Sequence, residues 1–135
     1  MNDLYQDEHG QDLIEYALVL PLFLLLVFGI IEFGLVIMSY NTIANAAREG
    51  ARAGILPPSD DCDTACRDAA AEVAARALTA GLNADELEVT VTRPGGGAIQ
   101  VEVDYVAHLI TGPIISAVGG DSAIPLQTIA TMKVE

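Results

Sequence analysis

One uninterrupted apolar run near the N-terminus constrains this chain more than any other feature. From Tyr16 to Met38 the sequence has a single charged residue, Glu32. As an α-helix these roughly 23 residues extend for about 34 Å, which is enough to cross a bilayer with some tilt. Pro21 lies inside the run, where it removes one backbone donor and can kink the helix without ending it. The run therefore predicts one membrane-spanning helix at residues 16–38.

The helical pattern continues beyond the apolar run. Residues 39–53, SYNTIANAAREGARA, are rich in alanine, and the next proline is Pro57. We therefore expect one helix over residues 11–54, of which only the first half fits in lipid. A secretory signal peptide is the alternative, because ANA at residues 44–46 has the small-x-small pattern of a cleavage site. Against it, the residues before the run are acidic, and the run exceeds the ~7–15 residues of such signals.

Composition argues against several classes of function. The chain has 6 Lys and Arg against 19 Asp and Glu, a net charge of -13, so it lacks the basic surface that binds nucleic acid or anionic lipid. Its two histidines and two cysteines are too few and too scattered for a zinc site of four close ligands. RPGGGAI, at residues 93–99, has neither the Lys-Ser/Thr nor the following helix of a phosphate-binding loop. We expect no enzymatic activity, no metal and no cofactor.

A small head is predicted after the long helix. Prolines and aspartates indicate a linker at residues 55–62. A second helix is expected over residues 63–80, with Gly81 as its C-terminal cap and one stripe of small apolar residues. The stripe consists of Ala69, Val73, Ala77 and Ala80. We expect its face to pack tightly on a sheet or on the long helix.

Three segments with alternating apolar and polar residues predict antiparallel strands, at residues 86–92, 98–105 and 126–134. Residues 93–97 form a hairpin turn between the first two. The expected fold class is thus α+β: a long transmembrane helix, then a head at residues 63–135 with one helix and a three- or four-stranded sheet.

The connection between the second and third strands, HLITGPIISAVGGDS, is too apolar for a free loop. Our preferred interpretation is that its apolar residues complete the core of the head; the alternative is a contact with another subunit. They are Leu109, Ile110, Ile114, Ile115 and Val118. We expect His108, beside them, to be a packing or edge residue rather than a ligand.

Cys62 and Cys66 lie four residues apart at the start of the second helix. An oxidising exterior would permit a disulfide between them. Helical geometry places their Cα atoms near the limit for such a bond, so slight unwinding of the first turn would help. We predict a disulfide.

The segments GQDLIEYALVLPLFLLLVFGIIEFG and NTIANAAREGARAG together resemble the TadE-like family of tight-adherence pilus proteins, pilin-like members of the type IV filament superfamily. The C-terminal IATMKVE is similar to the closing strand of that family. The resemblance implies a leader at residues 1–10, which a membrane aspartyl prepilin peptidase removes between Gly10 and Gln11. It also implies that Glu15 neutralises the N-terminal amine of a neighbouring subunit during assembly.

The residues predicted to take part in assembly are Glu15, Tyr16, Pro21, Glu32, Arg48 and Arg52. A carboxylate in the first turn of a helix is also favoured by the helix dipole, which is a second explanation of Glu15. Glu32 either extends its carboxylate into the outer headgroups or packs in the filament. In a filament its expected partners are Arg48 or Arg52 of adjacent helices.

The resemblance implies a structural subunit, minor or major, or an assembly component of a tight-adherence pilus. Its partners would be other pilin-like subunits, the prepilin peptidase, membrane lipid, and an inner-membrane platform with its ATPase. We expect a single-pass protein of the cytoplasmic membrane with its head outside, and a surface pilus after assembly. Arg48 and Arg52, the nearest basic residues to the span, instead favour a cytoplasmic C-terminus. The alternative function is a membrane-anchored extracytoplasmic binding module that never polymerises.

Overall fold

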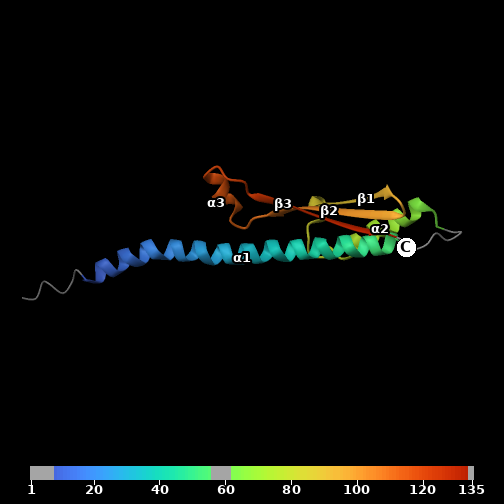
Figure 1. The fold of residues 1–135 in the computed structure, drawn as a ribbon. Helices are drawn as coiled ribbons and strands as arrows, with labels where there is room; N and C mark the ends of the chain where they lie inside the picture. The colour runs from blue at the N-terminus through green and yellow to red at the C-terminus, as the bar shows by residue number, and fades with distance from the viewer. Residues whose placement is uncertain (1–7, 56–61, 134–135) are drawn as a thin grey trace, which may run out of the picture. The chain divides into compact units, whose positions relative to one another are not determined.

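The computed structural model describes residues 8–55 and 62–133, and its first element is one long helix (Figure 1). This helix, α1, runs from Glu8 to Gly54 and contains Pro21 without interruption. It ends at the glycine predicted from the sequence and already includes the last residues of the predicted leader. Residues 1–7 of that leader and residues 56–61 of the predicted linker lie outside the described residues.

The chain forms two compact units, and the boundary between them lies inside α1. One unit ends at Gly34 and the other begins at Leu35. Residues 35–54 of α1 thus belong to the same unit as the head. Small and apolar residues of this part of the helix are fully buried: Ile43, Ala46, Ala47 and Ala51. The last part of α1 is therefore a core helix of the head, not a stalk beneath it.

The second helix, α2, covers Thr64–Ala77 and is capped by Asp63, whose side chain accepts a hydrogen bond from the backbone N–H of Cys66 at 2.8 Å. Its buried residues are Ala71 and Ala75. The stripe predicted from the sequence is wrong, because its members Ala69, Val73, Ala77 and Ala80 are all exposed. An alanine-rich helix has more than one face of small side chains. The face that α2 buries contains Ala71 and Ala75 and lacks the branched side chain of Val73.

The reason for this choice is a close contact between α2 and α1. A Cβ atom added to Gly50 would lie 2.9 Å from the carbonyl oxygen of Ala71 and 3.0 Å from Cβ of Ala75. A Cβ on Gly54 would lie 3.0 Å from Cβ of Ala71. Glycines four residues apart on one helix let the backbone of a second helix approach closely. Only a face as small as that of Ala71 and Ala75 fits there.

Three antiparallel strands follow a short 3-10 helix, η1 (Ala84–Glu86). They are β1 (Leu87–Gly95), β2 (Ala98–His108) and β3 (Ala123–Lys133), in the spatial order β1-β2-β3. The predicted α+β class is confirmed, and within residues 8–55 and 62–133 the sheet has three of the three or four strands expected.

The β1–β2 hairpin closes through Gly96 and Gly97, which have φ values of 65° and 75°. This left-handed conformation favours glycine and suits a two-residue hairpin turn. Before the turn the register shifts between Thr92 and Gly95, and the extra residue forms a β-bulge. A bulge tolerates a proline without a ladder donor and redirects neighbouring side chains.

One face of the sheet forms the core together with α1 and α2. Along β2 the inward residues Ile99, Val101 and Val103 are fully buried. Leu87 and Val89 of β1 join them in the same cluster with the alanines of both helices. The outward positions of β2, such as Gln100 and Glu102, are polar. The strand therefore alternates apolar and polar residues, as expected of a sheet with one face exposed to water.

The apolar connection between β2 and β3 does not complete this core. It forms a short helix, α3 (Gly112–Ala117), at the end of the β2–β3 hairpin (Figure 1). Ile110, Ile114 and Val118 keep 60%, 69% and 84% of their surface exposed. The preferred prediction of a core role is therefore wrong for these three residues. Since α1 and α2 already cover the inner face of the sheet, the connection projects beyond the strand ends.

Candidate functional site

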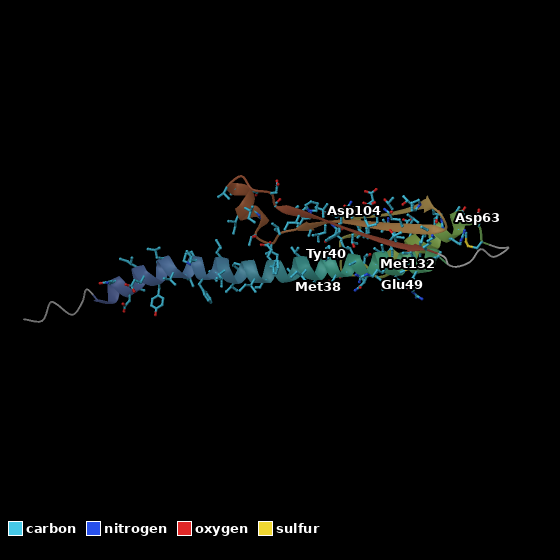
Figure 2. All side chains as sticks on the ribbon, viewed as in Figure 1. Met38, Tyr40, Glu49, Asp63, Asp104 and Met132 are labelled. Carbon is cyan, nitrogen blue, oxygen red and sulfur yellow. A yellow bond between two sulfur atoms is a disulfide. The ribbon has the colours of Figure 1, made fainter. Side chains whose placement is uncertain are left out.

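The first half of α1 presents an exposed apolar surface on all sides. Figure 2 shows its side chains extending from both sides of the helix. Among the described residues, α1 is the one helix long and apolar enough to cross a membrane by length and composition. Its most apolar 18-residue window has a mean hydropathy of 2.6 and none of it is buried within the chain. A surface of this kind needs lipid or other helices around it.

The residues predicted for processing and assembly lie at the start of this helix. Gly10 and Gln11 are exposed in the first turn of α1. Asp12, Glu15 and Tyr16 are also exposed, and together with Val19 they line one shallow hollow on the helix surface. Spacings of three and four residues place these side chains on one helix face.

The helix dipole does not account for Glu15 in the intact chain. Because α1 begins at Glu8, Glu15 lies about two turns inside the helix rather than in its first turn. The effect of the dipole on a side chain falls off within that first turn. A chain that began at Gln11 would again have Glu15 about one turn from its amino end.

The other predicted assembly residues are spread along α1. Glu32 follows Glu15 by 17 positions, about 25 Å along the axis. Arg48 follows Glu32 by about 24 Å, so the two cannot pair within one chain. Arg48 and Arg52 are both exposed, and Nε of Arg52 donates a hydrogen bond to Oε2 of Glu49 at 2.9 Å. This hydrogen bond, with the positive charge of Arg52, lowers the pKa of the Glu49 carboxyl. The same hydrogen bond, with the negative charge of Glu49, raises the pKa of Arg52.

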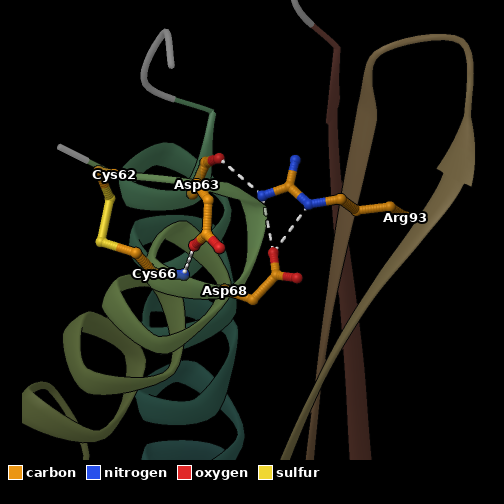
Figure 3. The surroundings of a disulfide bond; sticks show 6 residues. Cys62, Asp63, Cys66, Asp68 and Arg93 are labelled. Atoms are coloured by element: carbon orange, nitrogen blue, oxygen red, sulfur yellow. Dashed lines mark hydrogen bonds and ion pairs between the residues drawn. A yellow bond between two sulfur atoms is a disulfide. The ribbon is translucent and has the colours of Figure 1, made fainter. Parts of the chain in front are cut away.

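Cys62 and Cys66 are joined by a disulfide, with their Cα atoms 5.4 Å apart. The bond lies at the start of α2, next to the Asp63 cap (Figure 3). It joins Cys62, which precedes the N-cap Asp63, to the first turn of the helix. No group of three or more His, Cys, Asp and Glu side chains within residues 8–55 and 62–133 could hold a metal ion.

The sequence analysis did not predict a set of hydrogen bonds in the head that Arg93 donates. From the bulge in β1, Arg93 reaches α2, where Nε donates to Oδ1 of Asp68 at 2.8 Å (Figure 3). One terminal nitrogen also donates to the backbone oxygen of Gly54 at 3.2 Å. That oxygen is at the carboxyl end of α1, where a cation is favoured. The sequence RPGGG, which forms the bulge, was the feature that could have indicated a special position for Arg93.

His108 and Glu86 pair at the other end of the sheet. Nε2 of His108 lies 2.6 Å from Oε1 of Glu86, which belongs to η1. The histidine side chain is 60% exposed, so it is an edge residue rather than a core residue. Its position agrees with one of the two roles expected for it.

The fold and the exposed apolar surface together define a class of protein. Its members have one long apolar helix whose last part is the core helix of a small α+β head. Residues 10–52 match the family model described as TadE-like protein. The resemblance noted from the sequence is thereby confirmed over about a third of the chain, and the family is a pilus-associated, structural one. No curated protein and no solved structure matches the chain.

Proposed function

We propose that this chain is a structural subunit, minor or major, or an assembly component of a tight-adherence, type IV-like pilus. One observation carries the proposal: the TadE-like match covers a single helix with two different surfaces. Its first part is apolar and exposed, and its last part is the core of the head. Such a helix can leave lipid for a bundle of like helices while it keeps its head attached.

In this proposal, prepilin peptidase cleaves the chain between Gly10 and Gln11. The bond lies in the first turn of α1, and helix ends open at low cost. Cleavage creates a positive amine about one turn from Glu15. At an apolar boundary an unpaired charge is expensive, so the amine of one subunit and Glu15 of the next form a pair. That pair sets the axial stagger between neighbouring helices.

Packing and charge pairing, rather than hydrophobic gain, hold the proposed polymer together. Moving α1 from lipid into a core of similar helices exchanges one apolar environment for another, so the net hydrophobic gain is small. Glu32 of one subunit then meets Arg48 or Arg52 of an adjacent one. Extraction from the membrane needs an external motor, which we assign to a platform protein and a cytoplasmic ATPase.

We place the head on the outer side of the cytoplasmic membrane and, after assembly, on the surface pilus. The Cys62–Cys66 disulfide supports this orientation, because disulfides persist in oxidising compartments. The acidic composition of the head is compatible with a solvent-exposed surface.

Mass spectrometry of the N-terminus tests the proposal directly. Surface appendages are sheared from cells, and their protein is compared with that of the membrane fraction. We expect chains that begin at Gln11 in the appendages and a mixture of intact and cleaved chains in the membrane. A chain that keeps Met1 everywhere and never occurs in the sheared fraction would contradict the proposal and favour the membrane-anchored binding module.

A further inference from the structure

The outer face of the sheet holds two carboxylates side by side. Glu88 of β1 is directly opposite Asp104 of β2 in the antiparallel register. Both side chains point away from the core, because they alternate along their strands with the buried Val89 and Val103. Like charges directly opposite each other on a sheet destabilise it. A cation over Glu88 and Asp104, which we call the acidic pair, would therefore stabilise the sheet.

The chain itself does not supply that cation. Within residues 8–55 and 62–133, the side chains of the acidic pair take part in no hydrogen bond and no ion pair. The next outward carboxylate of β2 differs in this respect, since Oε1 of Glu102 accepts a hydrogen bond from Gln127 at 2.6 Å. The acidic pair is thus a part of the outer face whose charge is not compensated in the folded chain.

A hollow beside the acidic pair can admit a side chain from another molecule. Its volume is about 430 Å³, and the pair lines it together with Asp85 and Glu86 of η1 and with Tyr105 and Val106 of β2. Glu86 already faces His108. Carboxylates next to apolar surface suit a long cationic side chain, whose methylene stem packs on the apolar part while its charged end reaches the carboxylates.

Arg48 of α1 is a cation of the same unit that has the complementary property. Its side chain is exposed, and in the part of the chain that the structure describes it has no ion pair and no hydrogen bond. Arg52, Arg76 and Arg93 differ from it, since each pairs with a carboxylate of its own chain. Arg48 is therefore available to a carboxylate of another molecule.

Arg48 and the acidic pair lie on opposite sides of the head. The residues Asn41, Asn45, Arg48 and Arg52 are exposed and follow spacings of three and four, so they form one stripe along α1. The core residues of α1, such as Ala47, lie on the other side of the helix and pack against the inner face of the sheet. Arg48 thus points away from the sheet and the acidic pair points away from the helices, so the two meet only between different chains.

A contact of this kind is heterologous, because it joins two different surfaces of the same chain. Each copy offers Arg48 to one neighbour and the acidic pair to another, so the contact repeats as a ring or as a helical filament. Charge complementarity selects it: the chain has a net charge of -13 with only 6 Lys and Arg, so most other contacts between copies place like charges together.

The two groups also lie at similar heights within the head unit. β2 runs back along α1, with Ile99 and Val101 beside Gly54 and Gly50. The acidic pair follows Val101 by three strand residues, about 10 Å. Arg48 precedes Gly50 by two helical residues, about 3 Å. Two heads that lie side by side therefore need an axial shift of only about 7 Å to bring the groups together.

We propose that Arg48 of one copy docks over Glu88 and Asp104 of a second copy, so that the helix side of one head meets the sheet side of its neighbour. The inference deepens the proposed function and rests on it, since the copies meet as subunits of the pilus. It assigns Arg48 to the sheet of a neighbour and leaves Arg52 as the partner of Glu32.

Crosslinking between introduced cysteines tests the contact. Both cysteines of the chain are joined in the disulfide, so an added cysteine reports on contacts between copies. Asn45→Cys, one turn from Arg48, and Thr90→Cys, beside Glu88, are placed in two full-length chains with different tags, and both chains are produced in one cell. After treatment with a short bismaleimide, we expect a crosslink between the two variants and none between copies of the same variant.

Charge substitutions then test the role of the named side chains. Arg48→Gln in the Asn45→Cys chain should abolish the crosslink, and so should Glu88→Gln with Asp104→Gln in the Thr90→Cys chain. Arg48→Glu combined with Glu88→Lys and Asp104→Lys in the other chain should restore it. Arg76→Gln is the matched control, since Arg76 is an exposed arginine of the same unit, and it should leave the crosslink unchanged. An equal loss with Arg76→Gln, or a crosslink that persists with Arg48→Gln, would overturn the proposal.

The cellular fraction that contains the crosslink separates this inference from the proposed function. Chains that enter sheared appendages without a crosslink between positions 45 and 90 would overturn the contact and leave the pilus role intact. Chains that never enter the appendages but crosslink in the membrane would overturn the pilus role and support the contact. A crosslink from position 90 to a different protein, in place of the second copy, would overturn the assignment of the occupant.

Discussion

Arg93 of β1 and Asp68 of α2 are 25 residues apart in the sequence, yet Nε of Arg93 donates a hydrogen bond to Oδ1 of Asp68 at 2.8 Å. The same guanidinium also donates a hydrogen bond to the carbonyl of Gly54, the last residue of α1. One side chain thus joins the hairpin to both helices of the head. Only a quarter of it, 26%, is exposed, so water screens these contacts less than it screens a surface pair.

Replacing Arg93 with Ala should destabilise the head by about 1–2 kcal/mol, because it removes charge-assisted hydrogen bonds at a half-buried site. Arg93→Lys should recover only part of this, since an ammonium lacks the fork of donors. Hydrogen exchange of the β2 amides measures the change. Arg76→Ala, which breaks an exposed pair with Glu72, is the control and should cost less than about 0.5 kcal/mol. Equal losses in the two variants would refute the special role of Arg93.

Gly50→Ala should destabilise the head by about 1–3 kcal/mol, because the added methyl group meets the backbone of α2 at 2.9 Å. Gly34→Ala is the matched control: it lies in the same helix, and a Cβ there meets nothing within 4 Å. The control should leave the exchange of the β2 amides unchanged. If Gly50→Ala were as stable as the control, α1 and α2 would not pack as described.

Reduction of the Cys62–Cys66 disulfide should lower the free energy of unfolding by about 2 kcal/mol, the loss expected for a five-residue loop. Maleimide labelling of protein from the cell envelope should require prior treatment with a reductant. Cys62→Ser with Cys66→Ser should match the stability of the reduced protein. Rapid labelling without reductant would show that the two thiols are free in the cell.

Glu15→Ala should leave α1 in the membrane and stop incorporation into appendages, because the amine of a neighbouring subunit would lose its partner at an apolar boundary. Subunit content of sheared appendages, compared with that of membranes, measures this effect. Glu15→Asp should restore part of the incorporation. Asp12→Ala, on the same helix face, is the control for a general loss of charge. Normal incorporation of Glu15→Ala would rule out the pairing role.

The pair of Glu49 and Arg52 should make a small contribution to stability that depends on pH. The hydrogen bond from Arg52 lowers the pKa of Glu49 in the folded chain. The contribution is therefore present above the ordinary pKa of the carboxyl and disappears as the pH falls through the lowered value. An NMR titration of Glu49 should give a pKa below the ordinary one, and Arg52→Gln should return it. An unchanged pKa in Arg52→Gln would exclude this cause.

The sequence alone was enough for every element whose local pattern is strong. The apolar run and the alanine-rich continuation predicted α1 up to Gly54, and period-two alternation predicted three strands. The TadE-like resemblance also came from contiguous residues, as did the spacing of Cys62 and Cys66. In each case neighbours along the chain carry the information, so no knowledge of distant contacts was needed.

Tertiary structure alone decided which surfaces meet. The buried face of α2 is set by Gly50 and Gly54 of another helix, and helical periodicity within α2 cannot reveal them. The β2–β3 connection has the composition of a core, which made a core role the preferred interpretation over a contact with another subunit. The structure exposes Ile110, Ile114 and Val118, since α1 and α2 already cover the sheet. Burial is a competition among segments for one limited apolar surface, and its outcome depends on residues far apart in the chain.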